Sequence, residues 1–300
     1  MVDGEAEVVI DAGPHGWGNA GHGHADALSL QLMSRGRAPL SDPGTCCYPQ
    51  EKPERDLFRS TGAHNTLEVD GLSQAEPQGP FAWANHPRTT VEHWHTGELA
   101  DVFAGSHDGY RRLSQPVLHR RWIVLWKGSG WLVRDVASGT GLHGLAVSWH
   151  SAPGLMMRIV PAEGQDWVER TEEGVWSAAY GDCSRARVFR LRREGTLPAE
   201  CACVLATTDI DVRFRRIMRD ERVSVYEWRD HAGVRLIFFA EPGGIWEAEG
   251  FRSDAALLVA ALDENRRAAA LAACDVTRVE AEGRAIVRRT ETAAFYEWRA

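Results

Sequence analysis

The sequence predicts an all-β fold, a large antiparallel β-sandwich of the supersandwich-like kind. Short alternating or β-branched runs recur along the chain, and turn residues separate them at intervals of about ten residues. No long segment places apolar residues at the helical period of 3.6. Many short strands at this spacing are typical of a sandwich rather than of a small barrel.

The expected strands follow one another along the whole chain. They are expected at residues 7–10, 66–70, 88–95, 120–126, 131–136, 145–149, 223–228, 234–240 and 285–289. Residues 122–136 and 224–239 each read as a hairpin, because two apolar runs flank a turn sequence. The alanine-rich stretch 255–274 has helical propensity, but it lies among hairpins and contains the turn signal Asp-Glu-Asn. We therefore expect strands there too, and a long surface loop at 71–80.

The amino-acid composition favours a globular protein and argues against some other classes of protein. Hydrophobic residues make up 44% and charged residues 25%, as in an ordinary globular protein. The net charge of −8 argues against a nucleic-acid partner, whereas a local cluster of His and Arg could still bind an acidic sugar. No apolar run approaches the roughly 18 residues of a membrane span, and the N-terminus lacks the basic region of a signal peptide. Cys201 and Cys203 fall at strand period, which predicts that both point into the core.

No linker divides the chain, so residues 1–300 are expected to form one domain. The densest chemistry begins by His15, with almost no scaffold before it. We therefore expect the sequence to be a fragment of a longer chain.

Histidine and aspartate residues gather in the first 64 positions. In an extended segment His22 and His24 would project to one face, so both could reach a metal, or one could bind metal while the other faces substrate. Asp42 precedes a Pro-Gly turn, and His64 is expected to begin a strand. Two histidines and an aspartate are a common zinc ligand set, and Asp26 could accept a hydrogen bond from a ligand ring.

The His-x-His pattern alone is a weak signal, because several families carry it. Metallo-β-lactamases use His-x-His-x-Asp-His, but Ala27 stands where the last His is required. Cupins place a Glu a few residues further on inside a small barrel, whereas the next acidic residue here is Asp26 and the chain is too long.

An ordered series of motifs is more specific. It consists of Gly-His-x-His-x-Asp at 21–26, Gly-Arg-x-Pro-Leu-x-Asp-Pro-Gly-Thr at 36–45, Arg-Ser-Thr-x-Ala-His-Asn-Thr at 59–66, Val-Asp-Gly at 69–71, and the later segments 109–113, 117–122 and 131–136. This series resembles the C-terminal region of the heparinase II/III-like polysaccharide lyases. The resemblance is dense over residues 5–150 and looser beyond.

The resemblance implies a fold, an activity and a set of roles. Such lyases join an N-terminal (α/α) toroid to a C-terminal antiparallel β-sandwich and cleave uronic-acid polysaccharides by β-elimination. By the family pattern, His24, Asp42 and His64 bind one structural zinc, and His22 is a catalytic residue that neutralises the substrate carboxylate. The catalytic Tyr and its Asn or His partner belong to the toroid, so this chain alone is expected to be weak or inactive. A periplasmic or secreted location is also implied.

Several other residues are expected to have roles in substrate binding or in the fold. His15 and Trp17, in a Gly-rich loop, could stack on a sugar ring, and Arg59 could bind a carboxylate or form an ordinary salt bridge. Asn65 is expected to cap a turn with its side chain. If this chain alone were active, Tyr48 or Tyr110 would be the candidate acid.

His93 and His95 form a second His-x-His. No acidic residue is placed beside them in the sequence, so we interpret them as a solvated strand face. His119 is expected to pack or to form a hydrogen bond within the sandwich.

Two further readings remain open. One is a non-catalytic carbohydrate-binding or scaffold β-sandwich whose metal only stabilises the fold. The other is a metal-dependent hydrolase or oxygenase, which would need an open metal site with bound water.

Overall fold

The computed structural model describes residues 1–47, 53–155, 157–206 and 211–300. Strands hold 58% of the chain and helices 4%, which confirms the all-β prediction. Tyr48 lies outside the described residues. Within them no helix is long and apolar enough to cross a membrane.

The described strands form four antiparallel sheets. The N-terminal sheet has the order β1(Val2–Asp3), β2(Ala6–Ile10), β3(Leu30–Ser34) and β4(Arg37–Leu40). A second four-stranded sheet has the order β12(Val168–Trp176), β13(Ser184–Thr196), β10(Leu142–His150) and β5(Leu67–Val69). The six-stranded sheet has the order β11(Arg158–Pro161), β14(Ala199–Ala206), β9(Gly130–Gly139), β8(Val117–Trp126), β7(Ala100–His107) and β6(Thr89–Thr96).

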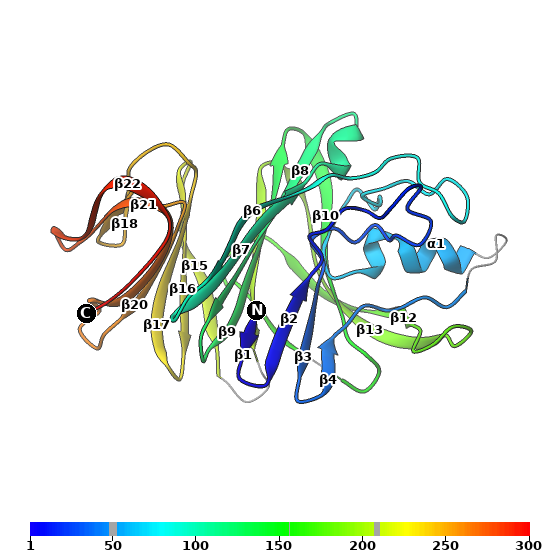
Figure 1. The fold of residues 1–300 in the computed structure, drawn as a ribbon, viewed down its shortest axis with the longest axis horizontal. Helices are drawn as coiled ribbons and strands as arrows, with labels where there is room; N and C mark the ends of the chain where they lie inside the picture. Colours follow the sequence, from blue (N-terminus) through cyan, green and yellow to red (C-terminus); the bar gives the residue numbers. More distant parts are fainter. Residues whose placement is uncertain (48–52, 156, 207–210) are drawn as a thin grey trace.

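The eight-stranded sheet holds the C-terminal third of the chain. Its order is β15(Arg213–Arg219), β16(Val223–Asp230), β17(Gly233–Ala240), β20(Leu257–Leu262), β21(Ala268–Ala281), β19(Phe251–Ser253) and β18(Trp246–Ala248), and β22(Arg284–Arg299) pairs with β21. The six-stranded sheet lies in the middle of the molecule, between this sheet and the two four-stranded sheets (Figure 1).

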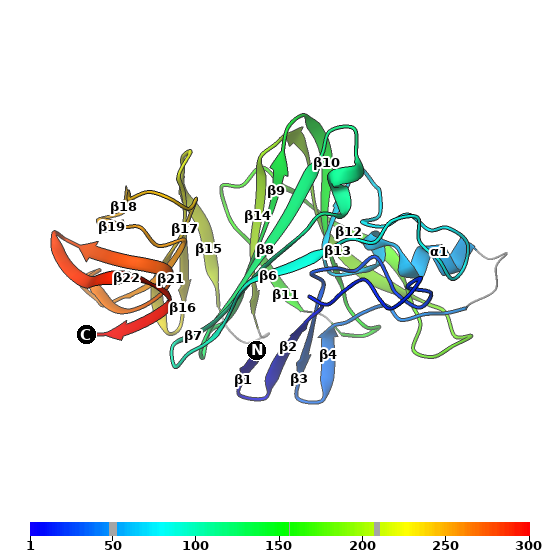
Figure 2. The same ribbon diagram turned by 45° about the horizontal axis from the view of Figure 1, so that its top comes forward.

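The middle sheet is buried on both faces because successive strand residues point to opposite sides. On β8, Ile123 and Leu125 pack into the core shared with the N-terminal half, whereas Trp122 and Val124 pack against the eight-stranded sheet. This explains why the apolar run Trp-Ile-Val-Leu-Trp does not alternate with polar residues. A third core fills the far side of the eight-stranded sheet, which curls at that end of the molecule (Figure 2).

The alanine-rich stretch forms strands, as the sequence analysis predicted. β20 and β21 pair antiparallel, and a turn separates them where Asp263 accepts hydrogen bonds from the backbone N–H groups of Asn265 and Arg267. Cys201 and Cys203 both lie in the core of the N-terminal half, which confirms their predicted direction.

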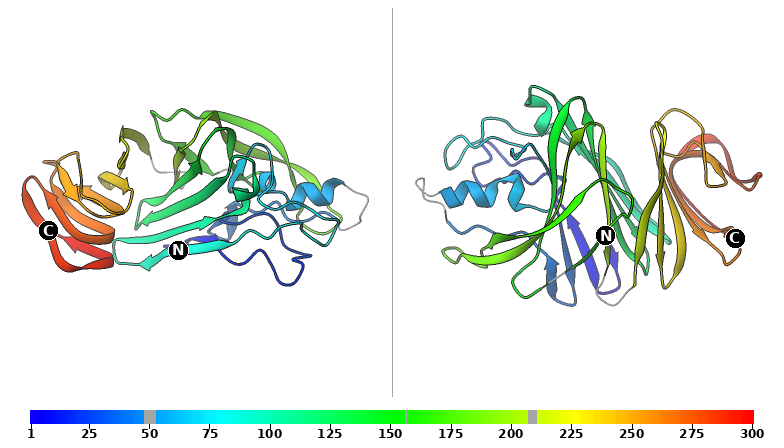
Figure 3. Two further views of the ribbon diagram at one scale, coloured as in Figure 1. Left: turned by 90° about the horizontal axis from the view of Figure 1, so that it is seen from above. Right: turned by 180° about the vertical axis from the view of Figure 1, so that it is seen from behind.

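Among the described residues, helical structure is confined to short pieces that the sequence pattern did not predict. The helix α1(Pro53–Arg59) is followed by the 3-10 turn η1(Thr61–Ala63), and η2(Gly109–Arg112) connects β7 to β8. Figure 3 shows α1 at the end of the molecule opposite to the C-terminal strands. His64 directly follows η1 and lies at the candidate site.

Candidate metal centre and its pocket

Four candidate ligands come together from three loops. His24 and Asp26 lie between β2 and β3, Asp42 follows β4, and His64 follows η1. Each residue offers one ligand atom, and these atoms all lie within 4.8 Å of one another. From the sequence, His24, Asp42 and His64 were expected as ligands, and Asp26 as a hydrogen-bond acceptor for a ligand ring. The structure brings Asp26 as close as the other three.

A tight turn holds the Asp42 carboxylate. Oδ1 accepts a hydrogen bond from the backbone N–H of Gly44 at 2.8 Å, and Oδ2 lies 2.6 Å from Nδ1 of His64. Gly44 has a φ of 81°, and a Cβ at this position would overlap the carbonyl oxygen of Ser177. Both facts require glycine at position 44, which explains the Asp-Pro-Gly sequence.

The loop that carries His24 is a turn and not the extended segment that we expected. The backbone N–H of Gly23 donates to the carbonyl of Ala20, and a Cβ on Gly23 would overlap the carbonyl oxygen of His15. His24 therefore joins the ligand group, whereas the ring of His22 lies 5.8 Å from that of Phe81.

The donor set fits a metal ion. His64 is fully buried, and its Nε2 has no hydrogen-bond partner among the described residues. The other ring nitrogen, Nδ1, lies 2.6 Å from Oδ2 of Asp42, so these two donor atoms are close enough to share one cation. Two imidazoles and two carboxylates suit zinc.

Burial shifts the pKa values of two candidate ligands, Asp26 and His24, so that the neutral form of each side chain is favoured. Burial, with the negative charges of Asp11 and Asp42 nearby, raises the pKa of Asp26 to about 7. Burial and the neighbouring His64 lower the pKa of His24 to about 4. The raised pKa means that little positive charge offsets the ionised form of Asp26, and a bound cation would supply it.

Three of the four candidate ligands, His24, Asp26 and Asp42, form part of the wall of an open pocket of about 600 Å³. Residues with expected substrate roles also line it, namely His15, Trp17 and His22. Trp17 is 96% exposed, so its indole is available to a ligand. His15 packs edge-on against Trp83, and its buried Nε2 has no partner among the described residues. Burial, with the charges of His86 and Arg59, lowers the pKa of His15 to about 4, so the ring is neutral at pH 7.

Arg59 takes the second of its two expected roles, that of an ordinary ion pair. Arg59 is fully buried, where its guanidinium donates to the carbonyls of Gly79 and Pro80 and pairs with Asp56. Because its guanidinium does not line the pocket, it cannot pair with a substrate carboxylate there. The salt-bridge alternative describes it better.

Asn65 does not cap a turn. Its side-chain amide donates to the carbonyls of Leu30 and Ser41, and its Oδ1 accepts from the backbone N–H of His150. Asn65 thus ties three segments together directly beside His64. The turn prediction failed because these partners are distant in sequence.

Sequence reasoning also missed the buried network beneath the site. Arg121 and Asp135 face each other across β8 and β9. The expected hairpin contained the signal, because its register places these two charges opposite each other inside an apolar sheet. His119 donates to Asp135 within this network, so the prediction of a hydrogen bond inside the sandwich is confirmed.

The prediction for His93 and His95 is wrong. Both rings lie at the interface with the eight-stranded sheet, and Nε2 of His93 lies 3.3 Å from Oδ2 of Asp275. The acidic partner is distant in sequence, so no local pattern indicated it.

Fold and site together define an antiparallel β-sandwich with a His- and Asp-lined candidate metal centre in an open pocket. The family model of the heparinase II/III-like C-terminal region matches residues 1–208. The chain therefore belongs to the heparinase II/III-like family. A comparison with curated proteins found no match.

Solved lyase structures share the fold. Heparan sulfate lyase HepC from Pedobacter heparinus is 18% identical, with a TM-score of 0.63 over 79% of this chain and 40% of that one. A heparinase III structure is 14% identical, with a TM-score of 0.58 over 80% of this chain and 43% of that one. The chain thus spans about two fifths of the length of the structures that it matches.

Proposed function

We propose that this chain is the β-sandwich part of a polysaccharide lyase that cleaves uronic-acid-containing polymers by β-elimination. One observation carries the proposal: a single pocket is lined both by candidate zinc ligands, among them His24 and Asp42, and by residues with expected substrate roles, namely His15, Trp17 and His22. Membership of the heparinase II/III-like family and the similarity of the fold to a solved heparan sulfate lyase support it.

In this proposal His24, Asp42 and His64 hold one structural zinc, and Asp26 is near enough to be a fourth ligand. The ion would fix the loop that carries His15, Trp17 and His22 by joining it to the segments after β4 and η1. The close approach of Nδ1 of His64 and Oδ2 of Asp42 is the strongest local support.

The chemistry assigns His22 a distinct task. In β-elimination a base removes the C5 proton, the C4–O bond breaks as a double bond forms, and the leaving oxygen takes up a proton. The C5 proton is weakly acidic while the adjacent carboxylate keeps its charge. A hydrogen-bond donor at that carboxylate stabilises the enolate-like transition state, and we assign this role to His22.

The acid that protonates the leaving oxygen is proposed to come from a helical toroid domain. Among the described residues no tyrosine lines the pocket. Tyr110 is fully buried, its hydroxyl lies against the carbonyls of Leu67 and Leu72, and burial raises its pKa. We therefore expect this chain alone to be inactive, and we place the complete lyase in the periplasm or outside the cell, where such polymers occur.

The test compares the complete gene product with this chain on heparin, heparan sulfate, hyaluronan and alginate. Turnover is read as absorbance of the unsaturated product. We expect activity of the complete protein on at least one polymer, and a loss of about 10²–10³-fold in His22→Gln. His231→Gln, at an exposed position outside the pocket, is the matched control.

Zinc content separates the lyase from its alternative. His24→Ala should lose one zinc per chain, and His22→Gln should keep it. A complete protein that binds zinc but cleaves none of the four polymers would instead support a carbohydrate-binding or scaffold module. Full activity in His22→Gln would contradict the role given to that ring.

A further inference from the structure

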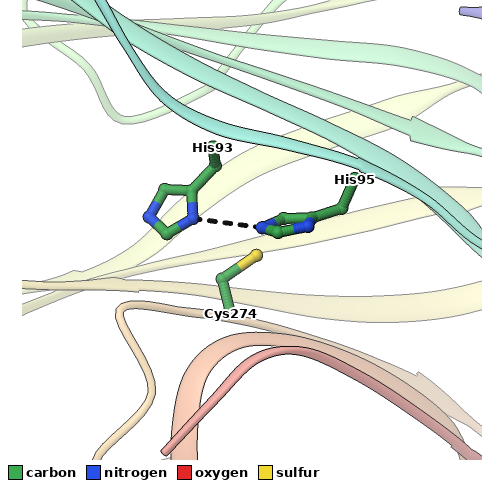
Figure 4. Close-up of side chains that lie close together, drawn as sticks. All are labelled: His93, His95 and Cys274. Carbon is green, nitrogen blue, oxygen red and sulfur yellow. Dashed lines mark hydrogen bonds between the residues drawn. The ribbon is translucent and has the colours of Figure 1, made fainter.

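A second group of candidate ligands lies between the six-stranded and the eight-stranded sheets. His93 and His95 come from β6 and Cys274 from β21, and their ligand atoms lie within 4.8 Å of one another. Figure 4 shows the two rings and the thiol directed toward one point. None of the three lines the pocket described above, so the cluster is independent of the proposed function.

A β-bulge brings the two rings to this face. Val91 pairs with Gly105, but after a register shift His93 pairs with Ala104 and His95 with Val102. Ala104 and Val102 point into the core that β7 shares with the eight-stranded sheet, where Cys274 also lies. Because cross-strand partners share a face, the bulge turns both histidines toward the thiol.

The spacing of the rings suits a metal better than a hydrogen bond. Nδ1 of His93 lies 3.4 Å from Nε2 of His95, which is long for a contact between two ring nitrogens. Zinc–nitrogen bonds of about 2.0–2.1 Å in a tetrahedron place two ligand nitrogens about 3.3–3.4 Å apart. The pair therefore already has the separation of two zinc ligands.

The other nitrogen of His93 has an acidic partner. Nε2 lies 3.3 Å from Oδ2 of Asp275, which leaves Nδ1 to face His95 and Cys274. Asp275 has a φ of 52°, an unusual conformation for a residue within a strand. A carboxylate behind a ligand imidazole is the usual support of a metal-bound histidine.

Aromatic neighbours hold both rings in place. His93 stacks on Trp122 with ring centres 5.2 Å apart and planes 25° apart. His95 stacks on Phe295 at 5.2 Å, with planes only 6° apart. Rings that are fixed before binding lose little freedom when they coordinate an ion.

We propose that His93, His95 and Cys274 form a structural zinc site that joins β6 to β21. Two imidazoles and a thiolate are borderline-soft donors of the kind that zinc selects, and a fourth position remains for water. Binding would release the thiol proton, because a coordinating thiol is deprotonated. The ion would cross-link two sheets that also meet through a shared apolar core and through the ion pairs of Glu200.

The thiolate provides a specific readout, because the first site contains no cysteine. The metal-free complete chain is titrated with Co²⁺, and a thiolate-to-cobalt charge-transfer band is sought in the near ultraviolet. We expect the band in the wild type and in His24→Ala, and its disappearance in Cys274→Ala and in His95→Gln. Cys203→Ala, which removes an equally buried thiol from another core, should keep it.

Zinc content gives a second measurement on the same variants. Cys274→Ala and His95→Gln should each lose one zinc per chain relative to Cys203→Ala, whatever the first site binds. His95 is only half-buried, so His95→Gln keeps the test decisive if Cys274→Ala does not fold by circular dichroism. A folded wild type without the cobalt band, or a band of equal strength in Cys274→Ala, would overturn the proposal.

Discussion

Arg121 and Asp135 form a two-point ion pair inside the sandwich. Nε of the arginine lies 2.7 Å from Oδ1 of the aspartate, and Nη2 lies 2.9 Å from Oδ2. The remaining Nη1 donates to the carbonyls of Leu28 and Asn65. The pair therefore connects the middle sheet to the loops that carry the candidate metal ligands.

Removal of the Asp135 carboxylate should strongly destabilise the folded protein. Asp135→Ala leaves the buried Arg121 without a counter-charge, and we expect a loss of about 3–5 kcal/mol in the free energy of unfolding measured with urea. The matched control is Arg185→Ala, which breaks an exposed pair with Glu173 and should cost less than about 1 kcal/mol. Equal effects of the two changes would show that water reaches Arg121.

Two buried histidines should make stability depend on pH. The backbone N–H of Gly109 donates to Nδ1 of His107, Nε2–H of His107 to Nδ1 of His119, and Nε2–H of His119 to Asp135. Each ring is thus satisfied in its neutral form. Burial lowers the pKa of both histidines below the ordinary value of 6.5, and for His107 the neighbouring His119 lowers it further.

The direction of this pH dependence follows from the protonation of the same histidines in the unfolded chain. Below pH 6.5 the unfolded state binds protons that the folded rings do not, so stability falls as the pH decreases from 6.5 toward the lowered values. Well below 6.5 each ring should contribute about 1.4 kcal/mol per pH unit. Urea unfolding with a chelator at pH 7.5 to 5.0 measures the slope, which should be shallower in His107→Gln and unchanged in His231→Gln. A slope that His107→Gln leaves unaltered would refute this account.

Glu297 holds the turn between β6 and β7. Its carboxylate accepts hydrogen bonds from the backbone N–H groups of Glu98, Leu99 and Ala100 at 2.8–2.9 Å. Glu297→Ala should leave the partly buried amides of Leu99 and Ala100 without acceptors and destabilise the chain by about 1–3 kcal/mol in urea unfolding. Glu291→Ala, at an exposed position on the same strand, should change little. A neutral Glu297→Ala would mean that water replaces the carboxylate.

Tyr110→Phe separates packing from catalysis. Loss of the hydroxyl, which lies 3.1 Å from the carbonyl of Leu67, should cost about 1 kcal/mol of stability. Activity of the complete protein should stay at the wild-type value, because the ring is buried away from the pocket. A large loss of turnover in a folded Tyr110→Phe protein would identify it as a catalytic residue after all.

Trp17→Ala should weaken binding of an acidic oligosaccharide about tenfold, because an exposed indole at the pocket can stack on a sugar ring. Calorimetric titration measures the change, and the free energy of unfolding should not move. Trp94→Ala, half-exposed on β6 and outside the pocket, is the control. Equal affinity in both variants would remove Trp17 from the binding site.

The local sequence pattern predicted the strands well, because each strand is a short apolar or alternating run that turn residues bound. The hairpin at 122–136 and the strand–turn–strand character of 255–274 were both recovered, the latter against alanine propensity. The helix α1 was missed because it is a single short segment with no repeated apolar face.

The candidate site was only partly predictable because its partners come from distant segments. His24, Asp42 and His64 were grouped through a resemblance, and the structure brings them together with Asp26. The tertiary contacts of Asn65 and Arg59 left no local signal. His93 was misread for the same reason, since Asp275 lies far along the chain.

The family match ends at residue 208, yet one face of the middle sheet is covered by strands that begin at Arg213. A piece cut at that boundary would expose Trp122, Val124 and Trp126 to water in a flat apolar sheet. Such a piece should aggregate when expressed. We therefore expect that the stretch that defines the family does not fold as a separate unit in this protein and requires the eight-stranded sheet.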